Sequence, residues 1–360
     1  MMKAPAEKLW DTRFIKTIKA LAPGTTLREG LENVLRAKMG ALVVIGDAPA
    51  VLTVVDGGFT IHSDFTPAGF YELAKMDGAL VLSSDARRII YANAQLVPDS
   101  TITTSETGTR HRTAERVAKQ TGAPTIAISQ RRNIITLYLG SLRYTLRDIT
   151  VIRSRADQAL QTLEKYRAVL QTGMIALNAL EFEDMTTLGD VAAVLIRAEQ
   201  VRRISLEVGR NIIELGSEGR LVSMQMDELG SDKDEVGLLI KDYYHENEAR
   251  SCDAAAEQLA ALPEENLEPG YICRILGYGA AVHVMDTPVI PRGFRVLNGI
   301  NRLPPAVIDN LVAQFTTLPR IYAATLEALD DVEGIGEVRA KAIKDGLKRL
   351  REQSLLDRLS

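Results

Sequence analysis

In the first part of the chain, some segments contain short continuous runs of apolar residues, and the segments between them have apolar residues at helical spacing. The run at residues 41–45 lies between two glycines and predicts a buried strand. Leu27, Leu31 and Val34 share one face of a helix predicted over residues 27–39. Connections of unequal length indicate an α/β domain with a mixed sheet. The other predicted strands are at residues 51–55, 78–82, 89–92, 125–128 and 134–138, and the other helices at 68–75 and 113–121.

The middle of the chain differs, because its apolar residues recur at helical spacing over long stretches. Gly173, Gly189 and Gly216 are predicted to interrupt these helices, and residues 233–261 are also predicted to be helical. This pattern alone indicates a helical spine or spacer. A Gly- and Pro-rich connector and a set of short helices follow it. We therefore predict three domains, at residues 1–148, 149–290 and 291–360.

Composition narrows the function classes. The 360 residues carry a net charge of −4, so any contact with nucleic acid must come from a local patch. The segment from residue 291 onward has 11 Lys and Arg against 9 Asp and Glu, which is a weak signal for DNA. Cys252 and Cys273 have no metal or redox spacing. Residues 1–11 contain no apolar leader, and no apolar run approaches the roughly 18 residues of a membrane helix, so we expect an intracellular protein without a membrane partner.

The densest polar cluster spans residues 107–116 and runs directly into a predicted helix. A helix start presents backbone N–H groups without intrahelical acceptors and the positive end of the helix dipole, and both favour an anion. Arginine binds phosphate oxygens in a bidentate manner. The alternative is a solvated helix start whose arginines pair with Glu106 and Glu115. The side chains that could bind phosphate are Thr109, Arg110, His111, Arg112 and Thr113.

Two polar turns are candidates for the same site. Asp77 and Gly78 precede a predicted strand, where a carboxylate can hold a divalent cation or accept a hydroxyl proton. The alternative is an ordinary turn aspartate. Ser129, with Arg131 and Arg132, follows another predicted strand, and ligands often bind beyond strand ends in open α/β sheets. The alternative there is a charged hairpin turn.

In this order and spacing, the Asp77–Gly78–Ala79 turn, the cluster at residues 108–116, and Ser129 with its arginines resemble the diadenylate cyclase (DAC) domain family. The resemblance extends over nearly the whole chain. It implies an α/β N-terminal DAC domain with a mixed sheet, an all-α helical spine and a C-terminal helix-hairpin-helix domain. The implied enzyme is a nucleotidyltransferase that condenses two ATP molecules into cyclic di-AMP and two pyrophosphates, with Mg²⁺ or Mn²⁺ as cofactor.

The resemblance also implies residue roles. Asp77 would be the catalytic carboxylate, which ligates metal or helps to deprotonate the attacking 3′-hydroxyl. Gly78 would let the backbone approach the nucleotide, and His111 would be a phosphate donor or a general acid. Because each nucleotide needs a facing partner, activity would require self-association, and the family implies a homo-octamer. The remaining nucleotide contacts would be Leu96 at the adenine, and Thr109, Arg110, Thr113, Ser129 and Arg131 at the phosphates.

Residues 329–343 resemble a helix-hairpin-helix motif, in which a Gly-x-Gly turn exposes backbone N–H groups to a DNA phosphate. The alternative is a structural αα-hairpin. Residues 296–307 look like a degenerate second hairpin that supports packing. The family implies that binding of branched DNA, such as a Holliday junction, regulates the cyclase of a cytoplasmic, nucleoid-associated protein. The candidate DNA-binding residues are Gly334, Gly336, Arg339, Lys341 and Lys344.

Two other functions compete with this interpretation. The first is a DNA-binding structural protein whose nucleotide domain senses ATP without catalysis, and the presence of Asp77 argues against it. The second is a nuclease or ligase accessory of DNA repair, suggested by the hairpin motif alone. Such an enzyme needs an acidic metal cluster or a nucleophilic lysine motif, and the sequence offers neither.

Overall fold

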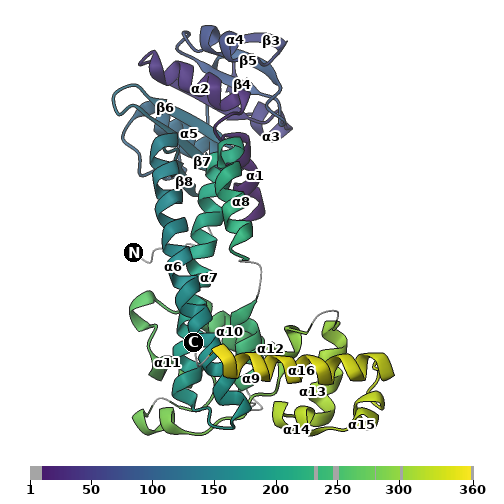
Figure 1. Cartoon of the computed structure of the whole chain (residues 1–360). Coiled ribbons are helices and arrows are strands. Elements are labelled where there is room, and N and C mark those ends of the chain that lie inside the picture. Colours follow the sequence, from purple (N-terminus) through teal and green to yellow (C-terminus); the bar gives the residue numbers. More distant parts are fainter. Residues whose placement is uncertain (1–9, 231–233, 246–250, 280, 301–302, 358–360) are drawn as a thin grey trace. The chain divides into compact units, whose positions relative to one another are not determined.

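The computed structural model describes residues 10–230, 234–245, 251–279, 281–300 and 303–357, and Figure 1 shows the chain. Residues 1–9, most of the stretch expected to lack an apolar leader, lie outside the described residues. The chain forms two compact units. Unit 1 comprises Met1–Asp157 and Gly209–Met224, and unit 2 comprises Gln158–Val208 and Gln225–Ser360. Within the described ranges, no helix combines the length and the apolarity needed to cross a bilayer.

Unit 1 contains an eight-stranded sheet in the order β2-β5-β4-β1-β6-β7-β8, with β3 also paired to β5. β1 and β4 are parallel, whereas the other neighbouring strands are antiparallel, so the predicted mixed sheet is confirmed. The strands are β1 Ala41–Ile45, β2 Val55–Asp56, β3 Phe59–Asp64, β4 Ala79–Leu82, β5 Arg88–Leu96, β6 Thr125–Ser129, β7 Ile134–Leu139 and β8 Leu142–Thr145.

Helices cover both faces of this sheet (Figure 1). Val43 of β1 packs in a core with α1, α2 and α4, and the next residue, Val44, packs in a second core with α3 and α5. A strand that is buried on both faces has no polar side, which explains why β1 is continuously apolar. The helices are α1 Thr12–Ala20, α2 Thr26–Arg36, α3 Pro49–Leu52, α4 Pro67–Leu73 and α5 Thr109–Thr121.

One predicted strand is wrong. Residues 51–55 were expected to be extended, but the chain forms the single helical turn α3 and reaches an extended conformation only at β2. Pro49 occupies the first position of α3, where its fixed φ favours a helix. Val51 and Val54 are buried in the core beside α5, so this apolar run packs a turn and not a strand.

Two long helices, α6 Ile149–Phe182 and α7 Leu188–Leu215, confirm the helical middle of the chain. Gly216 has a positive φ and ends α7, as predicted. Gly173 does not interrupt its helix; it lies inside α6, where a Cβ atom would be 2.9 Å from Nη1 of Arg197 on α7. Residues 233 and 246–250 of the predicted helical stretch lie outside the described residues. The following elements are η2 Gly216–Gly219, α8 Arg220–Glu228, α9 Glu235–Tyr243, α10 Cys252–Ala261, η3 Glu264–Asn266, α11 Pro269–Ile275 and η4 Val282–Asp286.

Five helices near the C-terminus pack around a core of their own, which includes Leu297, Leu311, Leu329 and Ile343. Val296 and Val307 of the predicted degenerate hairpin belong to this core, while residues 301 and 302 between them lie outside the described part. The three predicted domain ranges stay a prediction. The helices are α12 Phe294–Asn298, α13 Pro305–Phe315, α14 Leu318–Ala323, α15 Leu326–Asp330 and α16 Glu337–Asp357.

Candidate functional site

Three strand ends meet at one edge of the sheet. Val43 of β1 lies opposite Leu80 of β4, and Ala41 of β1 lies opposite Ile128 of β6. Continued past the strand ends, these registers place Gly40 between Asp77 and Ser129. Because β6 is antiparallel to β1, its carboxyl end lies beside the amino ends of β1 and β4. The fold therefore brings two of the predicted polar turns to the same edge.

Arg110 joins these turns to the start of α5. Its Nη2 lies 3.3 Å from Oδ1 of Asp77, although the two residues are 33 positions apart in sequence. The guanidinium lies against Gly40, where a Cβ atom would be 2.7 Å from Nη1. Asp77 is fully exposed and Arg110 is 40% exposed, so the ion pair is weak and can open for a ligand.

Gly78 is required by the packing of the strands themselves. A Cβ atom at this position would lie 2.3 Å from the carbonyl carbon of Asn93 on β5. The Gly78 N–H donates to Oδ1 of Asn93 at 3.0 Å, and Asn93 has a positive φ. The contact fixes the turn that carries Asp77, in addition to any role of Gly78 next to a nucleotide.

The first turn of α5 has the features expected of an anion site. Its N-cap is Gly108, which supplies no capping side chain, so the first backbone N–H groups are open to a ligand. Thr109 is exposed and Thr113 is half-buried. The alternative was a solvated helix start whose arginines pair with Glu106 and Glu115. The structure pairs Glu106 with Arg143 of β8 and Glu115 with Lys119.

His111 is the buried member of this turn. Its Nδ1 lies 2.8 Å from the hydroxyl of Tyr138, which donates in turn to Oε1 of Glu106 at 2.8 Å. Burial lowers the pKa of His111 below its usual value; Glu106 opposes this shift, and Arg132 and Arg143 add to it. The other ring nitrogen, Nε2, is buried and has no hydrogen-bond partner among the described residues.

The remaining predicted nucleotide contacts lie at the ends of β6 and β5. The hydroxyl of Ser129 accepts a hydrogen bond from the backbone N–H of Arg132 at 3.2 Å, and Arg131 is exposed in the same turn. Leu96 lies opposite Val55 of β2, and its side chain is buried in the core beside α5. The structure therefore places Ser129 at the edge with Asp77 and places Leu96 among core residues.

Sequence reasoning missed the residues that support the site. Gly40 makes room for the guanidinium of Arg110, and Asn93 packs against Gly78; both partners are distant in the sequence. The sequence predicted Tyr138 only as the last residue of a strand, although its hydroxyl forms hydrogen bonds with two polar side chains. A phenol inside a buried, mostly aliphatic strand is the signal that pointed to it, since such a hydroxyl needs a partner.

The donors available for a metal ion are few. Within the described residues, no three His, Cys, Asp or Glu side chains are grouped to hold one. Asp77 offers an exposed carboxylate at this edge, next to the uncapped start of α5. One carboxylate with substrate phosphate oxygens is a usual set of ligands for Mg²⁺, so the residues fit a metal that arrives with a nucleotide.

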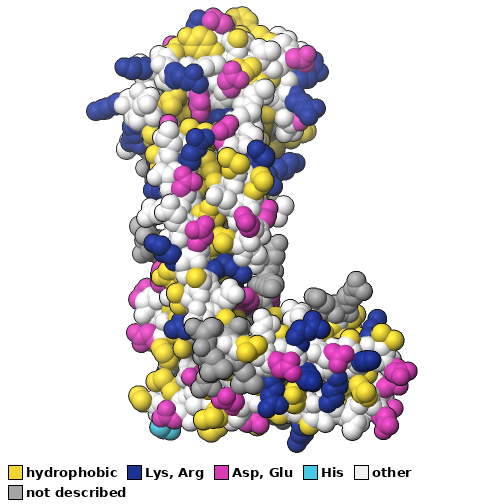
Figure 2. Space-filling model, viewed as in Figure 1, with side chains coloured by type: hydrophobic (Ala, Val, Ile, Leu, Met, Phe, Trp, Pro, Cys, Tyr) yellow, Lys and Arg dark blue, Asp and Glu magenta, His cyan; other side chains and the backbone are white. Residues whose placement is uncertain are grey.

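The predicted DNA-binding turn lies between α15 and α16. Gly334 has a positive φ, and its carbonyl accepts a hydrogen bond from Nη1 of the exposed Arg339 at 2.5 Å. A Cβ atom at Gly336 would meet nothing within 4 Å, so this turn is open to a ligand. Lys341 is exposed, whereas Nζ of Lys344 donates to the carbonyl of Tyr322 at 2.7 Å. Figure 2 shows Lys and Arg side chains over α16.

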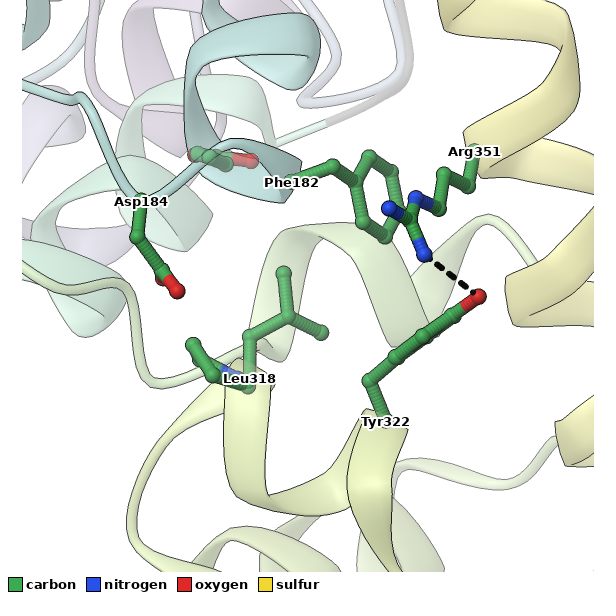
Figure 3. Close-up of a pocket in the computed structure, with 7 residues that line it drawn as sticks. Phe182, Asp184, Leu318, Tyr322 and Arg351 are labelled. Carbon is green, nitrogen blue, oxygen red and sulfur yellow. Dashed lines mark hydrogen bonds between the residues drawn. The ribbon is translucent and has the colours of Figure 1, made fainter.

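A separate cavity of about 160 Å³ lies in unit 2 and shares no residue with that turn. Arg351 donates to the hydroxyl of Tyr322 at 3.0 Å and lies over its ring, next to Phe182 (Figure 3). The side chains of Phe182, Tyr322 and Arg351 on the cavity wall therefore contact one another. Its lining consists of Glu181, Phe182, Asp184, Leu318, Pro319, Tyr322 and Arg351.

Almost the whole chain is similar to known proteins. Residues 28–142 match the family described as the DisA bacterial checkpoint controller nucleotide-binding region, and residues 146–285 match the DisA bacterial checkpoint controller linker region. The DNA integrity scanning protein DisA of Carboxydothermus hydrogenoformans is 55% identical over 346 residues, which are 96% of this chain and 98% of that protein. The protein of the same name from Symbiobacterium thermophilum is 54% identical over 347 residues, with 96% and 98% covered.

Proposed function

This chain belongs to the DisA family of DNA integrity scanning proteins, and we propose that it is a diadenylate cyclase, which joins two ATP molecules into cyclic di-AMP. One observation carries the proposal: the Asp77 carboxylate lies 3.3 Å from Arg110, at the uncapped start of α5. A carboxylate beside a set of phosphate-binding donors is what phosphoryl transfer requires, because that reaction depends on positioning and on stabilisation of charge.

In the proposed reaction, the 3′-hydroxyl of each ATP attacks the α-phosphate of the other. A new phosphorus–oxygen bond forms, the bond to pyrophosphate breaks, and the hydroxyl proton is lost. We assign to Asp77 the acceptance of that proton or the ligation of a metal, and to Arg110, which pairs with that carboxylate, the binding of phosphate. His111, Thr109 and Thr113 would add phosphate contacts from α5, and Ser129 with Arg131 would add contacts from the end of β6.

The cofactor would be Mg²⁺ or Mn²⁺, held by Asp77 together with phosphate oxygens. When bound, such an ion supplies positive charge that stabilises the transferring phosphoryl group. Arg110 and the N–H groups of the first turn of α5 supply further positive charge from the chain itself. Leu96 is retained as the proposed adenine contact, and because it is buried it would act through the shape of the surface around it.

One subunit alone cannot close the ring, because each nucleotide needs a partner that faces it. We therefore propose a self-associated enzyme, a homo-octamer according to the family resemblance. The Gly334–Gly336 turn is proposed to bind DNA phosphates without sequence specificity, with help from Arg339, Lys341 and Lys344. Binding of branched DNA would then regulate the cyclase in a cytoplasmic, nucleoid-associated protein. If the full chain and a chain that ends near Val289 respond identically to Holliday-junction DNA, this coupling is refuted.

The deciding experiment incubates the purified protein with ATP and either Mn²⁺ or Mg²⁺ and identifies the products by mass spectrometry. We expect cyclic di-AMP and pyrophosphate from the wild-type protein, and ATP binding without cyclic product from Asp77→Asn. Asp157→Asn, which neutralises an exposed carboxylate on α6, is the matched control and should retain activity. Normal turnover by Asp77→Asn would remove Asp77 from the mechanism. ATP binding without any product from the wild-type protein would favour a nucleotide sensor.

A further inference from the structure

A chain of hydrogen bonds fixes the position of the proton on His111. Oε1 of Glu106 lies 2.7 Å from Nε of Arg143, and because a guanidinium can only donate, this oxygen is an acceptor. The hydroxyl of Tyr138 therefore donates its single proton to Glu106. Burial and the carboxylate raise the pKa of Tyr138, so the phenol stays protonated.

With its proton committed to Glu106, the hydroxyl of Tyr138 can only accept from His111. The contact of 2.8 Å to Nδ1 then requires that Nδ1 carries the proton of the neutral ring. Nε2 is left as an acceptor. It is buried, has no partner among the described residues, and lies on the ring edge whose Cδ2 is 3.7 Å from a Cβ position at Gly108, the N-cap of α5.

A buried acceptor without a partner at an anion site calls for an explanation. A phosphate oxygen is also an acceptor, so it cannot bond to Nε2 unless a proton lies between them. The charged groups around the ring are Glu106 from the preceding loop, Arg132 from the β6–β7 turn and Arg143 from β8. In the free protein, burial and the two arginines keep the ring neutral; a bound triphosphate adds negative charge that favours protonation.

We propose that Glu106 and Tyr138 are positioning residues, which hold the proton of neutral His111 on Nδ1 so that Nε2 takes up a proton when a triphosphate binds at the start of α5. The inference deepens the proposed function, because the triphosphate in question is that of ATP. It also gives the condition that both roles expected of His111 share: Nε2 of the neutral ring cannot donate to phosphate, and only the protonated ring formed on binding can.

The position of the proton can be measured directly by ¹⁵N magic-angle-spinning NMR of the sedimented full chain labelled in histidine. The signal of His111 is identified by its loss in His111→Gln. We expect a protonated Nδ1 and a bare Nε2 in the wild-type protein near neutral pH, and in Tyr138→Phe a shift of the proton to Nε2. Tyr144→Phe, the same change on the neighbouring strand β8, should leave the wild-type pattern. A proton on Nε2 in the wild-type protein, or an unchanged pattern in Tyr138→Phe, would overturn the proposal.

The uptake of a proton is tested with inorganic triphosphate in the presence of EDTA. Calorimetric titrations at pH 7 in two buffers with different ionisation enthalpies give the number of protons exchanged. We expect the wild-type protein to take up about one more proton per subunit than His111→Gln, since the pKa of the ring rises from below its usual value to above the pH. Equal proton counts would refute this step. Neither measurement needs turnover, so a failure here and an absence of cyclase activity are separate results.

Discussion

Gly40 determines where the guanidinium of Arg110 can lie. In Gly40→Ala, the new methyl group would be 2.7 Å from Nη1, so the guanidinium that pairs with Asp77 must shift. We expect cyclase activity to fall by about 10- to 100-fold, because small displacements of positioned groups have effects of that order. The rate of cyclic di-AMP formation measures the effect. Gly209→Ala is the control, since its methyl group meets nothing within 4 Å, and normal activity in Gly40→Ala would show that Arg110 need not lie there.

Gly78 is expected to affect stability before it affects chemistry. A methyl group at this position would overlap the backbone of Asn93, which belongs to a paired strand and cannot rotate away. We expect Gly78→Ala to lower the free energy of unfolding of the domain by about 1–3 kcal/mol or more, the usual range for overpacking. Denaturant unfolding measures this loss. An unchanged midpoint would mean that the strands shift apart easily and that Gly78 serves the ligand alone.

At the scale of single residues, the sequence predicted the polar residues of the candidate site, but not the residues that pack against them. Asp77, Arg110 and Ser129 were predicted from residue type and spacing, and the structure brings them to one edge of the sheet. The roles of Gly40 and Asn93 could not be predicted from residue type. Each depends on which strand or side chain becomes its neighbour in the fold. The catalytic and binding roles themselves stay predictions until variants are measured.

The turn between α15 and α16 offers a test at the level of an element. A methyl group at Gly336 meets no atom within 4 Å, so Gly336→Ala should fold normally. The same methyl group would stand where a DNA phosphate must approach, and we expect DNA affinity to fall by about 10-fold, the effect of one lost phosphate contact of ~1.4 kcal/mol. Fluorescence anisotropy with a labelled duplex measures it, and unchanged affinity would argue for a purely structural hairpin.

Gly334 provides the contrasting variant in the same turn. Its φ is +84°, and a methyl group would lie 3.3 Å from Val307, so Gly334→Ala is strained whether or not DNA binds. We expect a loss of stability of about 1 kcal/mol in the C-terminal helices. Thermal unfolding should therefore separate the two glycines, with only Gly334→Ala lowering the transition temperature. A lower transition temperature for Gly336→Ala would contradict the open geometry of the turn.

The elements themselves followed sequence patterns where burial was complete. β1 was predicted with its observed ends, because glycines bound a run that is buried on both faces. β3 was missed, since most of its residues are exposed and its apolar alternation is limited to Phe59 and Ile61. The strand predicted at residues 51–55 was wrong because apolar content alone cannot distinguish a strand from one buried helical turn. Gly173 was expected to end a helix, yet it allows the close approach of Arg197.

For the whole molecule, the proposed chemistry makes the product depend on two sites at once. Each phosphodiester bond of cyclic di-AMP forms in a separate transfer, and each transfer needs its own Asp77. A facing pair that contains one Asp77→Asn subunit can complete one transfer only. It should release a linear dinucleotide in place of the ring.

Mixed assemblies of wild-type and Asp77→Asn subunits therefore distinguish paired sites from independent ones. When the two chains are co-expressed with different tags in equal amounts, random facing pairs are wild-type at both positions in about one quarter of cases. Cyclic di-AMP formation per assembly should fall to that fraction, with the linear product appearing beside it in the mass spectrum. The same mixture made with Asp157→Asn should lose nothing. A fall to about one half, in proportion to the wild-type subunits, would mean that each subunit closes its own ring, and the facing arrangement would then be wrong.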